Sequence, residues 1–298
     1  GASLRDTRRA SKWLSGLYRS DVDGARWSPL EPDRLGEYLV ASRLSSLPEI
    51  LGWVLRPTRE GDLLVRPLTV LTRAASYQPL RDQVKRVLVA HVGGLVDAAV
   101  SEANNPDRYL EGRSRLPRVL GETITMFGPL LGDEVLRGVS SSLPLQNHIL
   151  APLAASVEFS RVIVCRELAD PVGGNPAAYR PALASALNNL GSLLAELGRR
   201  EEALLPAEEA VDLYRGLADP VGGNPAAYRP ALAASLCVVS YVYALDEGSH
   251  DSALEAVGEA IVIFEQLAQE STVYSSRHQG ALELRRMLLE LKNGSASD

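Results

Sequence analysis

Twelve residues, DPVGGNPAAYRP at Asp170–Pro181, decide the fold, because the same letters return unchanged at Asp219–Pro230. The two copies begin 49 residues apart, and each lies between two segments that have the apolar periodicity of a helix. The repeating unit is therefore two helices and a linker. An internal repeat of this length predicts a helical solenoid, in which each unit buries its apolar face only against its neighbours.

The charge of the chain is divided unevenly along its length. Residues 1–165 contain 21 Lys and Arg against 18 Asp and Glu, whereas residues 166–298 contain 10 against 19, so the two parts carry +3 and −9. Nucleic-acid binding requires a clustered basic surface, and base stacking requires aromatic side chains, which make up only 5% of this chain. We therefore expect no nucleic-acid partner.

We expect a cytoplasmic protein with no membrane partner. No positively charged segment followed by an apolar core opens the chain, and no apolar run approaches the roughly 18 residues of a membrane span. Cys165 and Cys237 lie in apolar helical patterns, where buried thiols are commoner than disulfides. Because Gly1, Ala2 and Ser3 stand where an initiator Met is expected, we expect a fragment of a longer polypeptide.

The pattern along the chain predicts four regions. Residues 4–46 contain an amphipathic helix, a stretch with two prolines, and a second helix, an order typical of the end of a winged helix. Residues 47–146 form an irregular helical arm, with helices expected at 48–55, 62–75, 80–103, 116–127 and 130–142. Residues 147–292 hold the repeats, with helices expected at 147–169, 177–197, 200–218, 226–245, 252–269 and 274–292. Residues 293–298 are polar and expected to be disordered.

The first complete unit resembles the tetratricopeptide repeat (TPR). Leu187, Leu190 and Leu194 are spaced to pack its first helix, and Gly191 is small enough to let the second helix approach. Three alanines are spaced to line the contact face of that second helix: Ala203, Ala207 and Ala210. The next unit has Ser240 in place of the glycine. The fold class is therefore expected to be all-α, a TPR-like superhelix that follows an irregular helical region with a winged-helix remnant.

RWSPLEPDRLGEYLVA at Arg26–Ala41 is similar to the winged-helix end of bacterial STAND-type NTPases, relatives of the NB-ARC and NACHT proteins, in which an arginine-rich helical region leads into a TPR array. This resemblance implies a signalling or defence sensor, whose repeats recognise a trigger and whose upstream nucleotide-binding domain is the switch. The chain itself departs from the family, because a Walker A motif needs Gly-Lys-Ser/Thr, and Lys12, Lys85 and Lys292 follow Ser, Val and Leu. We therefore expect no cofactor here.

The sequence contains few residue patterns that indicate catalysis or metal binding. The four histidines are scattered, without a second His or a Cys pair at metal-ligand spacing, so we expect no zinc site. The chain contains no G-x-S-x-G motif. The acidic pairs at residues 201–202 and 208–209 suit a helix N-terminus or a solvated face. We expect a protein that is not an enzyme.

Candidate ligand-binding residues follow from helical spacing. On the first helix of each unit, the positions between the packing residues are expected to face the concave groove: Ser185, Asn188, Ser192, Cys237 and Tyr241. Asn188 is the strongest candidate, because a carboxamide can hold a peptide backbone through both its donor and its acceptor. The alternative for Asn188 is a structural hydrogen bond to a neighbouring helix or loop.

Two sets of arginines each allow two interpretations. Arg180 and Arg229 recur in the duplicated linker, where they either bind the last carbonyls of the preceding helix or face the groove and select a carboxylate. A second set of arginines either lies on a solvated helix face or contacts the missing domain or an anionic ligand. It contains Arg108, Arg113, Arg115 and Arg118.

The leading hypothesis from the sequence is a non-enzymatic sensor that binds a protein or peptide in the concave groove and relays binding to the absent switch domain. The alternative is a free-standing TPR scaffold that holds one protein partner constitutively. The sequence leaves the oligomeric state open.

Overall fold

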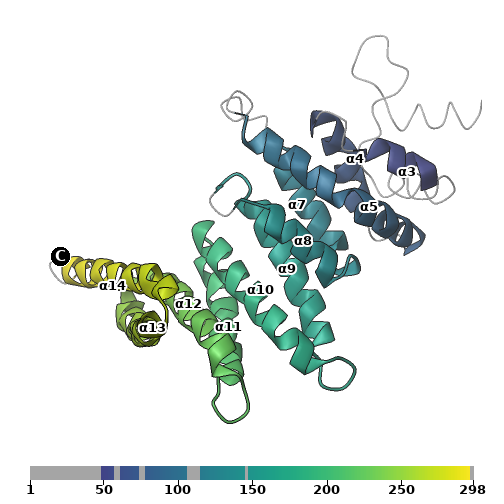
Figure 1. Ribbon diagram of the computed structural model, residues 1–298. Helices are drawn as coiled ribbons and strands as arrows, with labels where there is room; N and C mark the ends of the chain where they lie inside the picture. Colours follow the sequence, from purple (N-terminus) through teal and green to yellow (C-terminus); the bar gives the residue numbers. More distant parts are fainter. Residues whose placement is uncertain (1–47, 57–60, 74–77, 106–114, 145–146, 296–298) are drawn as a thin grey trace, which may run out of the picture.

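The computed structural model describes residues 48–56, 61–73, 78–105, 115–144 and 147–295, and within them every regular element is a helix. Figure 1 shows these helices in an extended array, with the N-terminal ones at one end and α14 at the other. The expectation of an all-α fold of sequentially packed helices is confirmed. The predicted winged-helix remnant, residues 4–46, lies outside the described residues, as do Arg108 and Arg113.

The N-terminal helices pack around one apolar core. They are α3 (Pro48–Val54), α4 (Gly61–Arg73), α5 (Gln78–Ala103), α7 (Leu116–Phe127) and α8 (Asp133–Ser142), with the short 3-10 helix η2 (Gly128–Leu130) between the last two. Phe127 and Leu120 of α7 are completely buried in this core. At residue 128 a side chain would collide with Ser160, because a Cβ there would lie 2.4 Å from the Ser160 hydroxyl. Glycine therefore allows the close crossing of this segment over α9.

The C-terminal helices form a second core and follow one another as antiparallel neighbours (Figure 1). They are α9 (Ala151–Leu168), α10 (Pro176–Glu196), α11 (Arg200–Leu217), α12 (Pro225–Ala244), α13 (His250–Glu270) and α14 (Ser275–Ser295), with short 3-10 helices η3 (Glu247–Ser249) and η4 (Thr272–Tyr274) on either side of α13. Each helix packs on the next, and α10 also contacts α12. This is the packing expected of stacked hairpins.

Gly191 does what its position predicts. A Cβ at this residue would lie 3.1 Å from the Cβ and 3.2 Å from the backbone nitrogen of Ala207, so glycine lets α10 and α11 approach closely. In the next hairpin Ser240 takes this place and is completely buried. Its hydroxyl donates a 2.7 Å hydrogen bond to the Ala253 carbonyl of α13, so the polar atom added by the serine has a partner.

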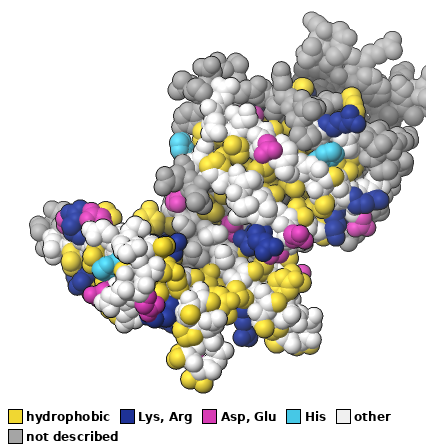
Figure 2. Space-filling view, in the orientation of Figure 1, with side chains coloured by type: hydrophobic (Ala, Val, Ile, Leu, Met, Phe, Trp, Pro, Cys, Tyr) yellow, Lys and Arg dark blue, Asp and Glu magenta, His cyan; other side chains and the backbone are white. Residues whose placement is uncertain are grey.

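The duplicated linkers are held by the same hydrogen bonds. In the first copy the Asp170 carboxylate accepts from the backbone of Val172 at 2.7 Å and of Gly173 at 3.3 Å, while the Asn175 side chain accepts from Ala178 and caps α10. The second copy repeats these contacts 49 residues later. Both linkers project from the same edge of the array (Figure 1), and Figure 2 shows hydrophobic atoms on these projections. The identical letters therefore encode an identical loop.

Some local expectations need correction. Helix α14 continues to Ser295, three residues beyond the end predicted at Lys292. His250, whose place in a turn suggests a solvated side chain, begins α13 and is buried. The glycine pair at residues 93–94 suggests a kink or a close helix crossing; α5 continues through both residues, and at Gly93 a Cβ would meet no atom within 4 Å, so Gly93 itself marks no close crossing.

Candidate functional site

Two cavities of about 380 Å³ each open between successive second helices of the hairpins. The first lies between α9 and α11 over α10, and it extends to α7. The second lies between α11 and α13 over α12. They are related by the repeat, because Phe159 and Leu190 line the first cavity, and Glu208 and Val239, each 49 residues later, line the second. The same place in the fold therefore occurs twice with different side chains.

The first cavity is mainly apolar. Its floor is formed by Leu190 and Leu194, one turn apart on α10, and its walls include Phe159 of α9 and Pro206 of α11. Phe159 leaves 44% of its surface exposed, although an aromatic ring of this size gains most by burial. The full lining consists of Arg118, Glu122, Thr125, Pro152, Ala155, Ser156, Phe159, Leu190, Leu194, Arg199, Glu202 and Pro206. A concave apolar surface with an exposed aromatic ring is suited to an apolar side chain of a partner.

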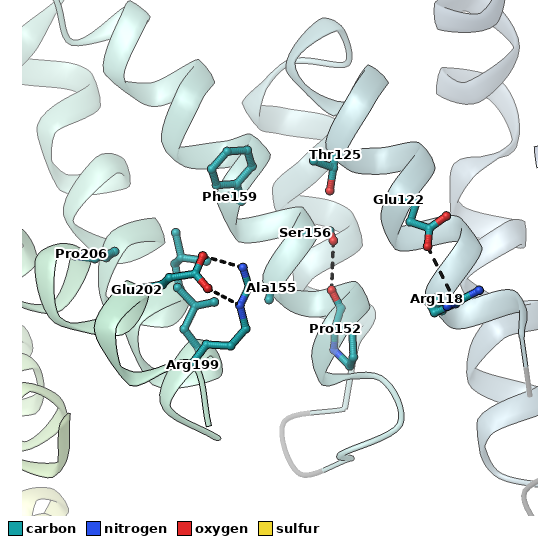
Figure 3. Close-up of a pocket in the computed structure, with 12 residues that line it drawn as sticks. Arg118, Glu122, Thr125, Pro152, Ala155, Ser156, Phe159, Arg199, Glu202 and Pro206 are labelled. Carbon is teal, nitrogen blue, oxygen red and sulfur yellow. Dashed lines mark hydrogen bonds and ion pairs between the residues drawn. The ribbon is translucent and has the colours of Figure 1, made fainter. Parts of the chain in front are cut away.

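Ion pairs flank this apolar cavity on two sides, as Figure 3 shows. On the side of α11, Arg199 holds Glu202 through two hydrogen bonds of 2.8 and 2.6 Å, and Arg199 lowers the pKa of the Glu202 carboxyl. On the side of α7, Arg118 lies 3.8 Å from Glu122. Both arginines are thus matched by a carboxylate. The rim is charged but balanced, and the cavity itself selects mainly by apolar contact.

The second cavity is acidic. Glu208, Asp212, Glu255 and Glu259 line it together with one cationic residue, Arg215. Arg215 pairs with Glu259 at 2.6 Å and lies 3.9 Å from Asp212. The lining therefore holds four carboxylates and one guanidinium. Its remaining members are Val211, Leu236, Val239, Tyr243, Ser252 and Ala256.

Tyr243 replaces an apolar residue in the second cavity, since it stands 49 residues after Leu194. Its hydroxyl donates a 2.6 Å hydrogen bond to Glu208. Burial, together with the Glu208 carboxylate that accepts this hydrogen bond, raises the pKa of Tyr243 to about 12. Tyr243 thereby fixes one carboxylate of the cavity in place.

An ion pair also recurs between successive second helices. Arg166 of α9 binds Glu209 of α11 at 2.5 Å, and Arg215 of α11 binds Glu259 of α13 at 2.6 Å. The arginines are 49 residues apart and the glutamates 50, which reflects one extra residue in the turn before α13. These half-exposed pairs add little stability individually. They connect the two walls of each gap at matching positions.

The five predicted groove residues lie on the opposite side of α10 and α12 from the cavities. Helical spacing of 100° per residue places Ser185, Asn188 and Ser192 across α10 from Leu190 and Leu194. Cys237 and Tyr241 occupy the corresponding side of α12, with Cys237 half-buried and Tyr241 exposed. None of these five lines either cavity.

Two of these residues have informative surroundings. The Oδ1 atom of Asn188 is buried and has no hydrogen-bond partner among the described residues, which is costly unless a donor reaches it. The Ser185 hydroxyl lies beside Tyr214 of α11. Burial raises the pKa of Tyr214, and the neighbouring Ser185 hydroxyl opposes that shift. Ser185 therefore contributes to the contact between helices.

The two linker arginines differ. Arg229 reaches α13, where it hydrogen-bonds Gln266 and lies 4.0 Å from Glu270. It contacts side chains of its own hairpin, and the predicted bond to helix-end carbonyls is not among the contacts of the described residues. Arg180 is exposed, and no described residue forms an ion pair with it. The two linkers are identical in sequence, but their arginines make different contacts.

A buried ionic network, which we did not anticipate from the sequence, joins α8, α9 and α10. Arg161 donates to Asp133 at 3.0 Å and to Glu158 at 2.9 Å, and all three side chains are more than nine-tenths buried. Glu158 also accepts from Ser140 at 2.5 Å and from Asn189 at 3.4 Å. The available signal was a charged pair three residues apart in the middle of the mainly apolar helix predicted at 147–169. This network lies where the two apolar cores meet.

Comparison with known proteins identifies no relative: no family model, no curated protein and no solved structure matches this chain. Among the described helices, none is long and apolar enough to cross a membrane. The function must therefore be argued from the surfaces described above.

Proposed function

We propose that this chain is a non-enzymatic protein-interaction module, and that a peptide segment of its partner binds the apolar cavity between α9 and α11. The observation that supports this most is Phe159, a 44% exposed aromatic ring beside a leucine floor in a cavity of about 380 Å³. An aromatic anchor at the centre of a concave surface is the usual seat of binding energy in protein interfaces. The sequence favoured the other side of α10, and Asn188 remains the candidate there.

Within this function we favour a sensor over a scaffold. The TPR-like hairpins and the similarity of residues 26–41 to STAND-type NTPases support a module that senses a trigger for an upstream nucleotide switch in the native polypeptide. The buried network supports a relay, because Glu158 and Asn189 are the neighbours of Phe159 and Leu190 along α9 and α10. A ligand that moves the α9 wall of the cavity would therefore disturb the hydrogen bond between Glu158 and Ser140 of α8.

The function is tested by affinity capture from extracts of the native host, prepared with and without phage or stress challenge. Phe159→Glu is the test variant. Val262→Glu is its matched control, because Val262 is a 53% exposed apolar residue on α13 that lines neither cavity. The captured protein is then purified, and its affinity for each variant is measured by calorimetry.

A purified partner that binds the Val262→Glu protein normally and the Phe159→Glu protein at least about tenfold more weakly supports the proposal. Capture only after challenge favours the sensor, whereas capture under both conditions favours the constitutive scaffold. A partner whose affinity is unaffected by Phe159→Glu contradicts binding in this cavity.

A further inference from the structure

We infer that the segment bound by this module is basic and amphipathic, with an apolar side chain in the first cavity and Lys or Arg side chains in the second. This inference rests on the proposed function and adds the chemical class of the ligand. Charge complementarity indicates the chemistry of the bound segment. An acidic cavity of equal volume lies next to the apolar cavity, on the same side of the array.

The two cavities can serve one ligand because they are neighbouring copies of one place in the fold. Leu194 of α10 and Tyr243 of α12 lie at equivalent positions in consecutive hairpins, as do Phe159 of α9 and Glu208 of α11. Helix α11 supplies a wall to each cavity, with Pro206 in the first and Glu208 in the second. A chain segment that passes over α11 therefore meets an apolar surface and then an acidic one.

The carboxylates of the second cavity outnumber the cation that its own residues supply. Arg215 is already held by Glu259 at 2.6 Å. Glu255 is exposed and forms no ion pair with any other residue in the described part of the chain, and the Asp212 side chain is 79% exposed. An ammonium or guanidinium group that enters here would gain Glu255, which has no ion pair in the described part of the chain, and Asp212, whose pair with Arg215 is long at 3.9 Å.

The charges on the described lining of the first cavity are balanced, two arginines against two glutamates. Its two arginines are matched by Glu202 and Glu122, so they present no unpaired positive charge. The net charge of the C-terminal part of the chain is negative, like that of the second cavity, because residues 166–298 contain 10 basic and 19 acidic residues. An excess of negative charge speeds the approach of a basic segment and disfavours an acidic one.

The test uses three fluorescent 20-residue peptides and the protein comprising residues 1–298. The first peptide carries Leu and Phe on one helical face in its first half and Lys in its second half. The second replaces Lys with Glu, and the third keeps Lys but replaces Leu and Phe with Ser. Asp212→Lys with Glu255→Lys is the test variant, and Glu201→Lys with Glu265→Lys is the matched control, since these exposed carboxylates lie on the same two helices outside the cavity.

We expect the Leu/Phe/Lys peptide to bind at least about tenfold more tightly than either other peptide, and to lose about tenfold in affinity in the Asp212/Glu255 variant but less than about threefold in the control. Equal binding of the Lys and Glu peptides, with both lost in Phe159→Glu, overturns the inference and leaves the proposed function standing. Equal losses in the test and control charge variants indicate attraction without a site and overturn it. Failure of all three peptides to bind overturns it as well.

Discussion

Arg161 of α9 donates a 3.0 Å hydrogen bond to Asp133 of α8 in the interior, where both side chains are less than a tenth exposed. Another nitrogen of the same guanidinium, Nη1, donates to Glu158 at 2.9 Å. Two carboxylates and one arginine are thus buried together between the N-terminal and C-terminal cores. Such a contact adds little net stability when it is complete, but it becomes costly when one member is removed.

Replacing Arg161 by Met should therefore destabilise the chain by about 3–5 kcal/mol, because two buried carboxylates lose their counter-charge. The triple change Arg161→Met, Asp133→Asn and Glu158→Gln removes the charges together and should cost much less. Urea denaturation followed by circular dichroism measures both. A single variant as stable as the wild type would mean that the network is solvated.

The duplicated linker offers a paired test of backbone crowding. A Cβ at Gly174 would lie 2.2 Å from the Leu168 carbonyl oxygen, whereas a Cβ at Gly173 would meet no atom within 4 Å. Gly174→Ala should thus lower the free energy of unfolding by about 1–3 kcal/mol, while Gly173→Ala should change it by less than about 1 kcal/mol. Thermal unfolding of the two proteins decides the matter. Equal effects would show that the loop relaxes freely.

Alkaline pH should destabilise the chain through its buried thiol. Burial, reinforced by the neighbouring Asp133 carboxylate, raises the pKa of Cys165 to about 12, from 9.0 for an ordinary thiol. Above pH 9 the unfolded state releases this proton and the folded state keeps it, so the unfolded state binds fewer protons and stability falls as pH rises. The slope is about 1.4 kcal/mol per pH unit for this group between pH 9 and 12.

Denaturation of the wild type and of Cys165→Ala at pH 8 and pH 10.5 isolates this effect. The wild type should lose more stability between the two pH values than the variant, by roughly 2 kcal/mol. A difference that does not depend on pH would show that Cys165 ionises normally in the folded chain.

The sequence predicted the helices well, because apolar periodicity, prolines and the duplicated linker are local signals. Leu116–Phe127 matches at both ends, and Gly198, which directly follows the helix predicted at 177–197, has the positive φ of +71° that glycine adopts readily after a helix. The close approach at Gly191 was also predictable, since a small residue stands at this position of both repeats, as Gly191 and as Ser240 49 residues later. These features depend on residues that are near in the sequence or one repeat apart.

The cavities were harder to predict, because they depend on how far successive second helices separate. Phe159 is a packing residue by periodicity alone, and only the gap between α9 and α11 leaves it exposed. Its comparison with Glu208, 49 residues later, was a usable signal, because an apolar residue and a carboxylate at one repeat position indicate a surface. The partnership of Asp133 and Arg161 joins residues 28 apart and needed the structure.

The most direct measurement is site-specific photo-crosslinking in host extract, with a benzophenone amino acid placed at position 159, at 192 or at 262. These positions report the apolar cavity, the face predicted from the sequence, and an exposed control on α13. We predict one discrete adduct from position 159, absent from position 262, and outcompeted by unlabelled wild-type chain. An adduct from position 192 with none from position 159 would contradict binding in the cavity between α9 and α11.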